Sequence, residues 1–382
     1  MHIDDLLKVA IEMDASDVHV KVGNHPQLRI HGQLVPLTHL PRLTAKDTED
    51  VAFQIMNEAQ KKRLEEDFDL DLAYSLPGFG RFRGCIFRQR GSLAVSLRIL
   101  PFEVKGFKEL LLPASVETIA ATERGLVLVT GSTGSGKSTT LASIIDYINE
   151  TRREHIITIE DPIEYLHRDK KSVVCQREVG WDVKSFARGL RSALREDPDI
   201  ILVGEMRDLE TIETAIVAAE TGHLVLSTLH TLDAPETINR IIAVFTPHQQ
   251  RQIRIQLASI LKAVISMRLV PRKDGKGRVP AVEIMRSTAY IQECIQERGK
   301  KTYLIRDAIA AGVSQYGMQT FDQSLFYLFQ QNYISFEQGL RYSTSPDNFR
   351  LRVEGIQSTQ DIAMEEMEKS LKNIERRRPD ED

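Results

Sequence analysis

The sequence predicts an α/β protein in which a small α+β domain precedes a larger domain with a mostly parallel sheet. Two patterns support this fold class. Between residues 125 and about 285, short apolar runs alternate with helical patterns, which is typical of a parallel sheet flanked by helices. Before them, one amphipathic helical pattern is followed by alternating apolar and polar residues, as in half-buried strands. A chain of 382 residues suits two or three domains with substantial cores.

The first hundred residues predict a helix followed by a sheet. Apolar side chains recur at helical spacing over residues 3–13, and three valines then alternate with polar residues. A second alternating stretch at residues 68–74 precedes two turn glycines, which suggests hairpins that continue to about Ile99. We therefore assign residues 1–100 to a small α+β domain, and residues 101–113, where the pattern lapses, to a linker.

The larger domain is assigned to residues 114–285. Strands are expected at residues 125–130, 155–159, 199–203 and 224–226, and helices at residues 185–195 and 209–219. Beyond Pro280 the pattern becomes mostly helical, so residues 286–365 are assigned to a C-terminal helical region. The charge-dense residues 366–382 predict a solvated tail that is partly disordered.

The composition argues against a membrane span and against a nucleic-acid partner. Hydrophobic residues make up 42% and charged residues 27% of the chain, and it contains no run of eighteen apolar residues. The first residues lack the basic and apolar regions of a secretory signal, so a cytoplasmic location is expected. A net charge of -4 gives no global electrostatic reason to bind DNA.

The three cysteines, Cys85, Cys175 and Cys294, are widely separated in the sequence. This spacing excludes a four-thiolate zinc site and disfavours a disulfide framework. We therefore expect all three to be core residues.

Residues 131–138 form a glycine-rich segment between an apolar strand and a helical stretch. In order, the segment reads Gly131, Ser132, Thr133, Gly134, Ser135, Gly136, Lys137 and Ser138. Its glycines allow backbone N–H groups to point at phosphate oxygens, and Lys137 adds a cation there. The helix that continues through Thr139 contributes the partial positive charge of its N-terminus. The segment predicts a site for ATP and Mg²⁺, with Ser138 as a metal ligand and Thr139 among the nucleotide-binding residues.

A second apolar strand, at residues 199–203, runs into Gly204 and Glu205. A strand of this form delivers an acid beside the metal in P-loop ATPases, although Gly204 stands where an aspartate is usual. Glu205 is then the nearest carboxylate that could hold Mg²⁺ or orient its bound water. The alternative is that Glu205 pairs with Arg207 or caps the next helix.

Three carboxylates, Glu160, Asp161 and Glu164, follow the strand at residues 155–159. Pro162 forces a turn that can direct these side chains into a site. Glu164 is the candidate base that orients or deprotonates the attacking water, and Glu160 and Asp161 are candidates for the metal shell. In isolation, an acidic loop of this kind is also compatible with simple exposure to solvent.

Two histidines, His223 and His230, bracket an apolar strand beside the acidic one. The chain offers no third ligand at a spacing suited to zinc. Two interpretations stay open, since these side chains could be structural hydrogen-bonding groups or could sense the γ-phosphate and contact the catalytic carboxylates. We include His230 among the nucleotide-binding candidates.

Four segments, in this order and spacing, resemble the secretion ATPase superfamily: residues 131–138, 157–164, 200–205 and 223–230. In that family the last three are the Asp box, an atypical Walker B motif and the His box. The resemblance extends over about residues 1–355. It implies an α/β fold in which a PAS-like α+β domain precedes a RecA-like P-loop ATPase domain, with C-terminal helices.

Four further motifs most resemble the type IV pilus retraction branch of this family, at residues 17–19, 176–180, 195–199 and 317–323. The short N-terminus and the absence of a tetracysteine zinc motif disfavour the pilus-assembly and type II secretion branches, which stay as alternatives. The resemblance thus implies an ATP hydrolase that powers pilus retraction, and with it twitching motility.

The family works as a hexameric ring beneath an inner-membrane platform protein, so the resemblance implies a homo-hexamer, or a ring mixed with a paralogous retraction ATPase. It also implies that arginines of the N-terminal domain complete the site of a neighbouring subunit. The candidates are Arg81, Arg83 and Arg98, because such arginines stabilise transition-state charge. Taken singly, a strand arginine is more often a solvated side chain.

One segment departs from the family pattern. Retraction motors carry an Ala-Ile-Arg-Asn motif in the C-terminal region, and this chain has Tyr290, Ile291, Gln292 and Glu293 in that place. A cation is lost and an anion is gained far from the phosphates. This change favours the hypothesis of an accessory paralogue that assists retraction.

Two rival functions belong to other classes. A RecA-like core also serves DNA translocases and recombination ATPases, because a fold alone does not determine function. The chain lacks the basic stripe that such an activity requires. The second rival is a regulatory subunit that binds ATP without hydrolysing it.

Overall fold

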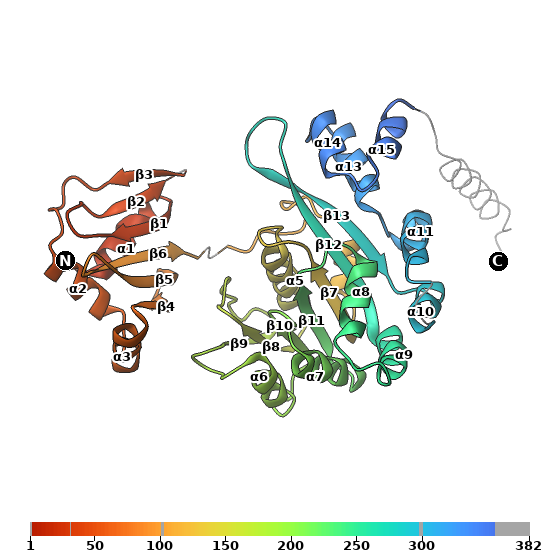
Figure 1. The fold of residues 1–382 in the computed structure, drawn as a ribbon, viewed down its shortest axis with the longest axis horizontal. Coiled ribbons are helices and arrows are strands. Elements are labelled where there is room, and N and C mark those ends of the chain that lie inside the picture. Colours follow the sequence, from red (N-terminus) through yellow and green to blue (C-terminus); the bar gives the residue numbers. More distant parts are fainter. Residues whose placement is uncertain (1, 31, 101–102, 298–300, 356–382) are drawn as a thin grey trace. The chain divides into compact units, whose positions relative to one another are not determined.

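The computed structural model describes residues 2–30, 32–100, 103–297 and 301–355 (Figure 1). These residues form two compact units. The first holds the described residues up to Glu103 together with Pro162–Leu166, and the second holds the others. We describe each unit by itself.

The first unit is a six-stranded antiparallel sheet with strand order β3-β2-β1-β6-β5-β4 and three helices. Its elements are α1 (Ile3–Glu12), β1 (Ala15–Val20), β2 (Gln27–Ile30), β3 (Gln33–Pro36), α2 (Ala45–Gln54), α3 (Glu58–Asp67), β4 (Asp69–Leu76), β5 (Gly80–Gln89) and β6 (Ser92–Ile99). Side chains alternate along β5, where Phe82 and Ile86 are fully buried and Arg83 is exposed. Arg81 and Arg83 therefore lie on the face opposite the core.

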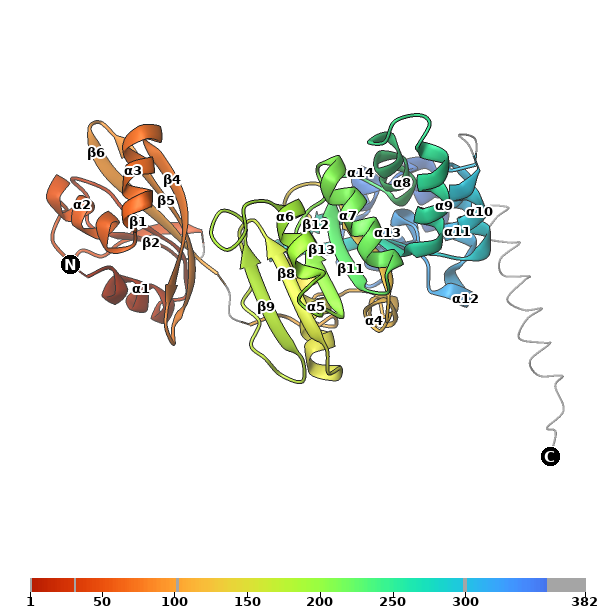
Figure 2. The same ribbon diagram turned by 90° about the horizontal axis from the view of Figure 1, so that it is seen from below.

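The second unit is built on a seven-stranded sheet with strand order β13-β12-β7-β11-β10-β8-β9. All neighbouring strands are parallel except β12 and β13, which pair antiparallel. The strands are β7 (Gly125–Thr130), β8 (His155–Glu160), β9 (Val173–Glu178), β10 (Ile200–Val203), β11 (Leu224–Leu229), β12 (Leu261–Pro271) and β13 (Arg278–Arg286). Figure 2 shows β8 and β9 side by side at one edge.

Helices of the second unit include α4 (Ser115–Ala120), α5 (Lys137–Thr151), α6 (Phe186–Ala193), α7 (Leu209–Glu220), α8 (Ala234–Ala243) and α9 (Gln250–Ile260). Every residue of β7, β10 and β11 is buried, as expected for central strands of a parallel sheet that is covered on both faces. These three strands provide the rigid frame for the loops at their carboxyl ends.

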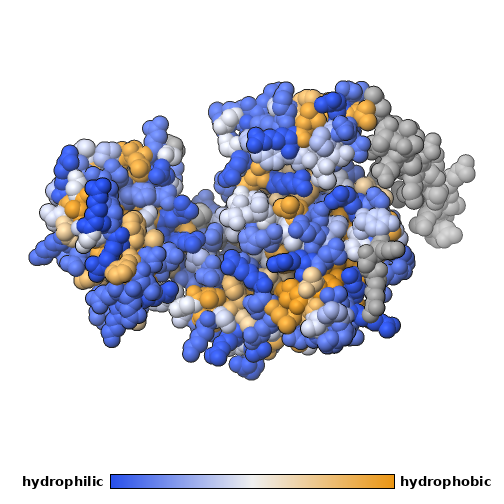
Figure 3. Space-filling view, viewed as in Figure 1, coloured by the Kyte–Doolittle hydropathy of each residue, from blue (hydrophilic) through white to orange (hydrophobic). Residues whose placement is uncertain are grey.

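A C-terminal helical region follows β13 and consists of α10 (Ala289–Gln296), α11 (Leu304–Ala311), α12 (Val313–Tyr316), α13 (Phe321–Gln330), α14 (Phe336–Tyr342) and α15 (Pro346–Val353). The predicted α/β fold class with C-terminal helices is confirmed. The charged tail expected at residues 366–382 lies outside the described residues. No helix in the described part of the chain is long and apolar enough to cross a membrane. The face in Figure 3 is mostly hydrophilic, with separate apolar patches.

The expectation of three core cysteines was wrong for Cys175, which is exposed, and Cys85 is only partly buried. The reason is the position of β9 at the edge of the sheet, where alternate side chains such as Val173 also face solvent. Cys294, on α10, is buried as expected.

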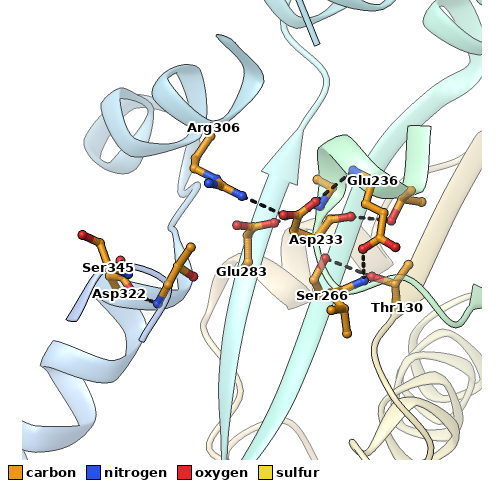
Figure 4. Close-up of polar contacts among 12 residues, drawn as sticks. Thr130, Asp233, Glu236, Ser266, Glu283, Arg306, Asp322 and Ser345 are labelled. Atoms are coloured by element: carbon orange, nitrogen blue, oxygen red, sulfur yellow. Dashed lines mark hydrogen bonds and ion pairs between the residues drawn. The ribbon is translucent and has the colours of Figure 1, made fainter. Parts of the chain in front are cut away.

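A buried carboxylate lies in the antiparallel strand β13. Glu283 is 3% exposed, and its Oε1 accepts a hydrogen bond of 3.0 Å from the Ala234 N–H at the start of α8 (Figure 4). Burial raises the pKa of Glu283 to about 7; Asp233 adds to the rise, whereas the Ala234 N–H, Arg306 and Arg268 oppose it. The fold therefore contains a buried group that titrates close to neutral pH.

This raised pKa predicts that Glu283 destabilises the second unit as the pH rises. Between about pH 4.5 and 7 the unfolded chain loses its proton first, so the free energy of unfolding falls, by an amount on the order of 3 kcal/mol. Glu283→Gln cannot titrate at this position. The melting temperature of the variant minus that of the wild type should therefore be larger at pH 8 than at pH 5, and thermal unfolding at both pH values measures this gain. An equal gain in Glu150→Gln, which alters an exposed ion pair, would contradict the prediction.

Candidate nucleotide site

The glycine-rich loop joins β7 to α5. Gly131, Gly134 and Gly136 have φ values of 141°, 75° and 100°, in the region that favours glycine. A Cβ on Gly131 would lie 2.5 Å from the Met267 carbonyl oxygen and from Ser135 Oγ. The loop therefore requires glycine at this position, both for its backbone conformation and for its packing against β12.

Lys137 is folded back over the loop. Its Nζ donates hydrogen bonds of 2.9 Å to the Gly131 carbonyl and 3.0 Å to the Ser132 carbonyl. Burial lowers the pKa of Lys137, and the Glu205 carboxylate opposes this shift. Ser135 Oγ is buried without a hydrogen-bond partner among the described residues. A loop with a cation, an unpaired hydroxyl and a helix N-terminus fits the phosphates of a nucleotide.

The two residues that follow the lysine differ in exposure. Ser138 is exposed, and Thr139 is half-buried. Both belong to the first turn of α5, where backbone N–H groups lack partners within the helix. Ser138 can present its hydroxyl to a metal ion at the mouth of the loop.

Parallel pairing brings Glu205 and His230 to the edge of the sheet where β7 runs into the loop. β11 lies between β7 and β10, with Leu229 opposite Thr130 and Val203 opposite Ser227. Glu205 Oε2 lies 3.4 Å from His230 Nε2, and its Oε1 lies 2.6 Å from Arg207 Nε. The structure thus places Glu205 among Lys137, His230 and Arg207.

Close packing explains why glycine stands at position 204, where an aspartate is usual. Its N–H donates a hydrogen bond of 2.8 Å to the Ile159 carbonyl at the end of β8. A Cβ at this position would lie 3.3 Å from both that carbonyl oxygen and the Phe186 ring. β8 and α6 therefore approach this position closely, and the nearest carboxylate is that of the next residue, Glu205.

The Asp-box acids are placed differently from one another. Glu160 ends β8, and its Oε1 accepts hydrogen bonds of 2.6 Å from Thr158 Oγ1 and 3.1 Å from Gln176 Nε2. Asp161 is exposed. Glu164 belongs with the first unit, where its carboxylate lies 3.9 Å from Arg83 Nη1.

His223 lies at the opposite end of β11 from His230. Its Nδ1 is 2.9 Å from the Ala218 carbonyl oxygen, and it lines a cavity of about 690 Å³ together with Tyr147, Arg152 and Asp199. Because parallel strands end at one edge, this cavity is remote from the glycine-rich loop. His223 is therefore a structural hydrogen-bonding residue, which was one of the two open interpretations.

The candidate arginines lie on neighbouring strands of the first unit, Arg81 and Arg83 on β5 and Arg98 on β6. Arg98 Nε donates a hydrogen bond of 3.0 Å to the buried Asp17, while the Arg98 side chain stays 67% exposed. Burial works against ionisation of Asp17, but hydrogen bonds from Ser16 and Arg98 keep the pKa of Asp17 below its usual range. Asp17 thus holds Arg98 in place while leaving most of the guanidinium accessible.

Sequence reasoning missed a second group of charged residues near the His-box strand. Asp233 caps α8 by accepting a hydrogen bond from Glu236 N, and it pairs with Arg306 at 2.8 Å. The sequence carried a signal for the cap, because Asp233 precedes a proline and a glutamate at helix-start spacing. Glu283 was also detectable as the only acid in an apolar strand.

The fold and the glycine-rich loop together define a P-loop ATPase. A model of the family described as "Type II/IV secretion system protein" matches residues 1–315. The chain belongs to this family.

Two curated relatives from Pseudomonas aeruginosa are similar over most of their length. The type IV pilus retraction ATPase PilT is 45% identical, over 91% of this chain and 100% of the relative. The type IV pilus ATPase PilU is 38% identical, over 92% of this chain and 91% of the relative. A crystal structure of the pilus retraction motor PilT with bound ADP has a TM-score of 0.84 and 49% identity, over 91% of this chain and 98% of that chain.

The close packing at Gly204 generates a stability prediction. Gly204→Ala should destabilise the second unit by about 1–2 kcal/mol, because β8 or Phe186 must shift to admit the methyl group. Gly106→Ala is the matched control, since a Cβ there meets nothing within 4 Å. Thermal unfolding of both variants measures the difference. Equal melting temperatures would show that the approach of β8 does not require glycine.

Proposed function

We propose that this chain is an ATPase motor that powers type IV pilus retraction. The main support is its 45% identity to a retraction ATPase over the relative's whole length, with Lys137, Glu205 and His230 gathered at the loop. In this proposal the chain acts as a hexamer on the cytoplasmic side of the inner membrane, against a pilus platform protein. The division into a domain of residues 1–100, a linker of residues 101–113 and a core of residues 114–285 is part of the same proposal.

The proposed chemistry assigns a task to each element of the site. Backbone N–H groups of residues 131–139 and Lys137 would hold the phosphates of ATP, with His230 nearby as a hydrogen-bonding contact. Ser138, Glu205 and Glu160 would hold Mg²⁺, which neutralises charge on the phosphates when it is bound. The Lys137 ammonium must then exchange its two carbonyl partners for phosphate oxygens.

Residues of the first unit would complete the reaction. Glu164 is the proposed base that orients the attacking water, since carboxylates serve this purpose in phosphoryl transfer. Arg81, Arg83 and Arg98 of a neighbouring subunit would stabilise the transition-state charge. The bond between Asp17 and Arg98 supports this role, because a guanidinium that is held in place loses less conformational freedom on binding.

A second candidate is an accessory motor that works in a ring mixed with a paralogous ATPase. The observation that favours it is the segment of α10 with Tyr290, Gln292 and Glu293 in place of the family motif. Tyr290 is 48% exposed, and Glu293 lies 3.1 Å from Lys301, so this surface presents an anion that is held by an exposed ion pair. The altered charge lies on the protein surface, where a partner protein can reach it.

Gene deletion tests the proposed function and separates the two candidates. If the chain is the retraction motor, deleting its gene alone should abolish twitching, and Glu150→Gln should restore it whereas Lys137→Ala should not. If the chain is an accessory motor, twitching should persist in the single deletion. In a strain whose sister motor is weakened, deleting this gene as well should abolish the twitching that remains. Unchanged twitching in every such strain would refute a role in retraction.

A further inference from the structure

A row of three polar residues crosses the sheet from the glycine-rich loop to Glu283. Thr130, the last residue of β7, precedes Gly131 and donates a hydrogen bond of 2.9 Å to Ser266 Oγ on β12. Ser266 pairs in register with Glu283 on β13 (Figure 4). All three residues are buried, so the row cannot rearrange by exchanging partners with bulk water.

The same carboxylate also meets the segment that follows His230. Glu283 accepts its hydrogen bond from the first N–H of α8, and Asp233, three residues after His230, caps that helix. Figure 4 shows Asp233 and Glu283 side by side at this helix end. Two separate connections therefore lead from the nucleotide site to Glu283. One crosses from β7 through β12, and the other follows the chain from the end of β11 to the start of α8.

From this point the contacts continue into the C-terminal helices. Arg306 on α11 pairs with Asp233 Oδ2 at 2.8 Å. On the neighbouring strand, the Arg268 guanidinium lies 3.8 Å from the ring centroid of Phe321 at the start of α13. Arg268 Nη1 also donates a hydrogen bond of 2.8 Å to the Tyr342 carbonyl at the end of α14.

We propose that Asp233, Glu283 and Arg306 form a charge link that couples the nucleotide site to the C-terminal helices. A shift of His230 or of the loop displaces the start of α8 or the β7–β12–β13 row, and the ion pair passes this displacement to α11. Asp233 and Arg306 are positioning residues in this scheme, since neither touches the glycine-rich loop. The inference rests on the proposed role of residues 131–139 and His230 in nucleotide binding.

Hydrogen exchange of the full chain, with and without saturating ADP, tests the charge link. ADP should slow exchange of the α11 amides about fivefold or more in the wild type. Asp233→Asn keeps an N-cap acceptor but removes the charge, and Arg306→Gln removes the partner. Each variant should bind ADP and lose most of the ADP response at α11, the double variant should lose no more than either single one, and Arg306→Lys should retain part of it.

The matched control is Arg191→Gln, which breaks an ion pair of the same length, 2.8 Å to Glu210, elsewhere in the second unit; the two arginines are similarly exposed, at 57% and 50%. It should leave the ADP response of α11 unchanged. A response that survives in both Asp233→Asn and Arg306→Gln, or that is lost equally in Arg191→Gln, would overturn the inference. A wild type that binds ADP without a response at α11 would also overturn it while leaving the proposed function intact, whereas failure to bind ADP would refute the proposed function.

Discussion

The nucleotide site depends on the register of three buried parallel strands, β7, β11 and β10. Their apolar side chains are buried on both faces and do not by themselves distinguish one register from another. Two hydroxyl groups do so: Ser227 donates to the Val203 carbonyl and Thr228 to the Gly204 carbonyl, each at 2.7 Å. A shifted register would leave these buried hydroxyls unpaired, which is costly. The pairing brings Gly131, Gly204 and His230 to one edge of the sheet.

The charged side chains at this edge, Lys137 and Glu205, are held by interactions that they can exchange for others. Burial of Lys137 is compensated by two loop carbonyls and by Glu205, so its ammonium is held without a direct ion pair to any residue that the structure describes. Glu205 pairs with an Arg207 side chain that is 73% exposed, and pairs with an exposed partner contribute little, at most about 1 kcal/mol. The carboxylate can therefore leave Arg207 at small cost. In contrast, the Glu283 carboxylate is buried and hydrogen-bonded, so it can change position only when the strands and helices around it move.

Local patterns sufficed to predict much of this structure. The strands at residues 125–130, 155–159 and 199–203 are rich in apolar residues, and the glycines of the loop are visible in the sequence as a motif. Contacts between distant residues were not predictable. Asp17 and Arg98 are 81 positions apart, and Asp233 and Arg306 are 73 positions apart, so neither pair leaves a sequence pattern. The exposure of Cys175 depends on the strand order, which periodicity does not encode.

ATP turnover of the purified chain and of Glu164→Gln, with the assembly state measured in the same samples, tests the central claim most directly. The account predicts that the wild type hydrolyses ATP as a hexamer and that the variant assembles and binds ATP but loses most of its turnover. An assembled wild-type hexamer that binds ATP without hydrolysing it, or a variant with undiminished turnover, would contradict the account.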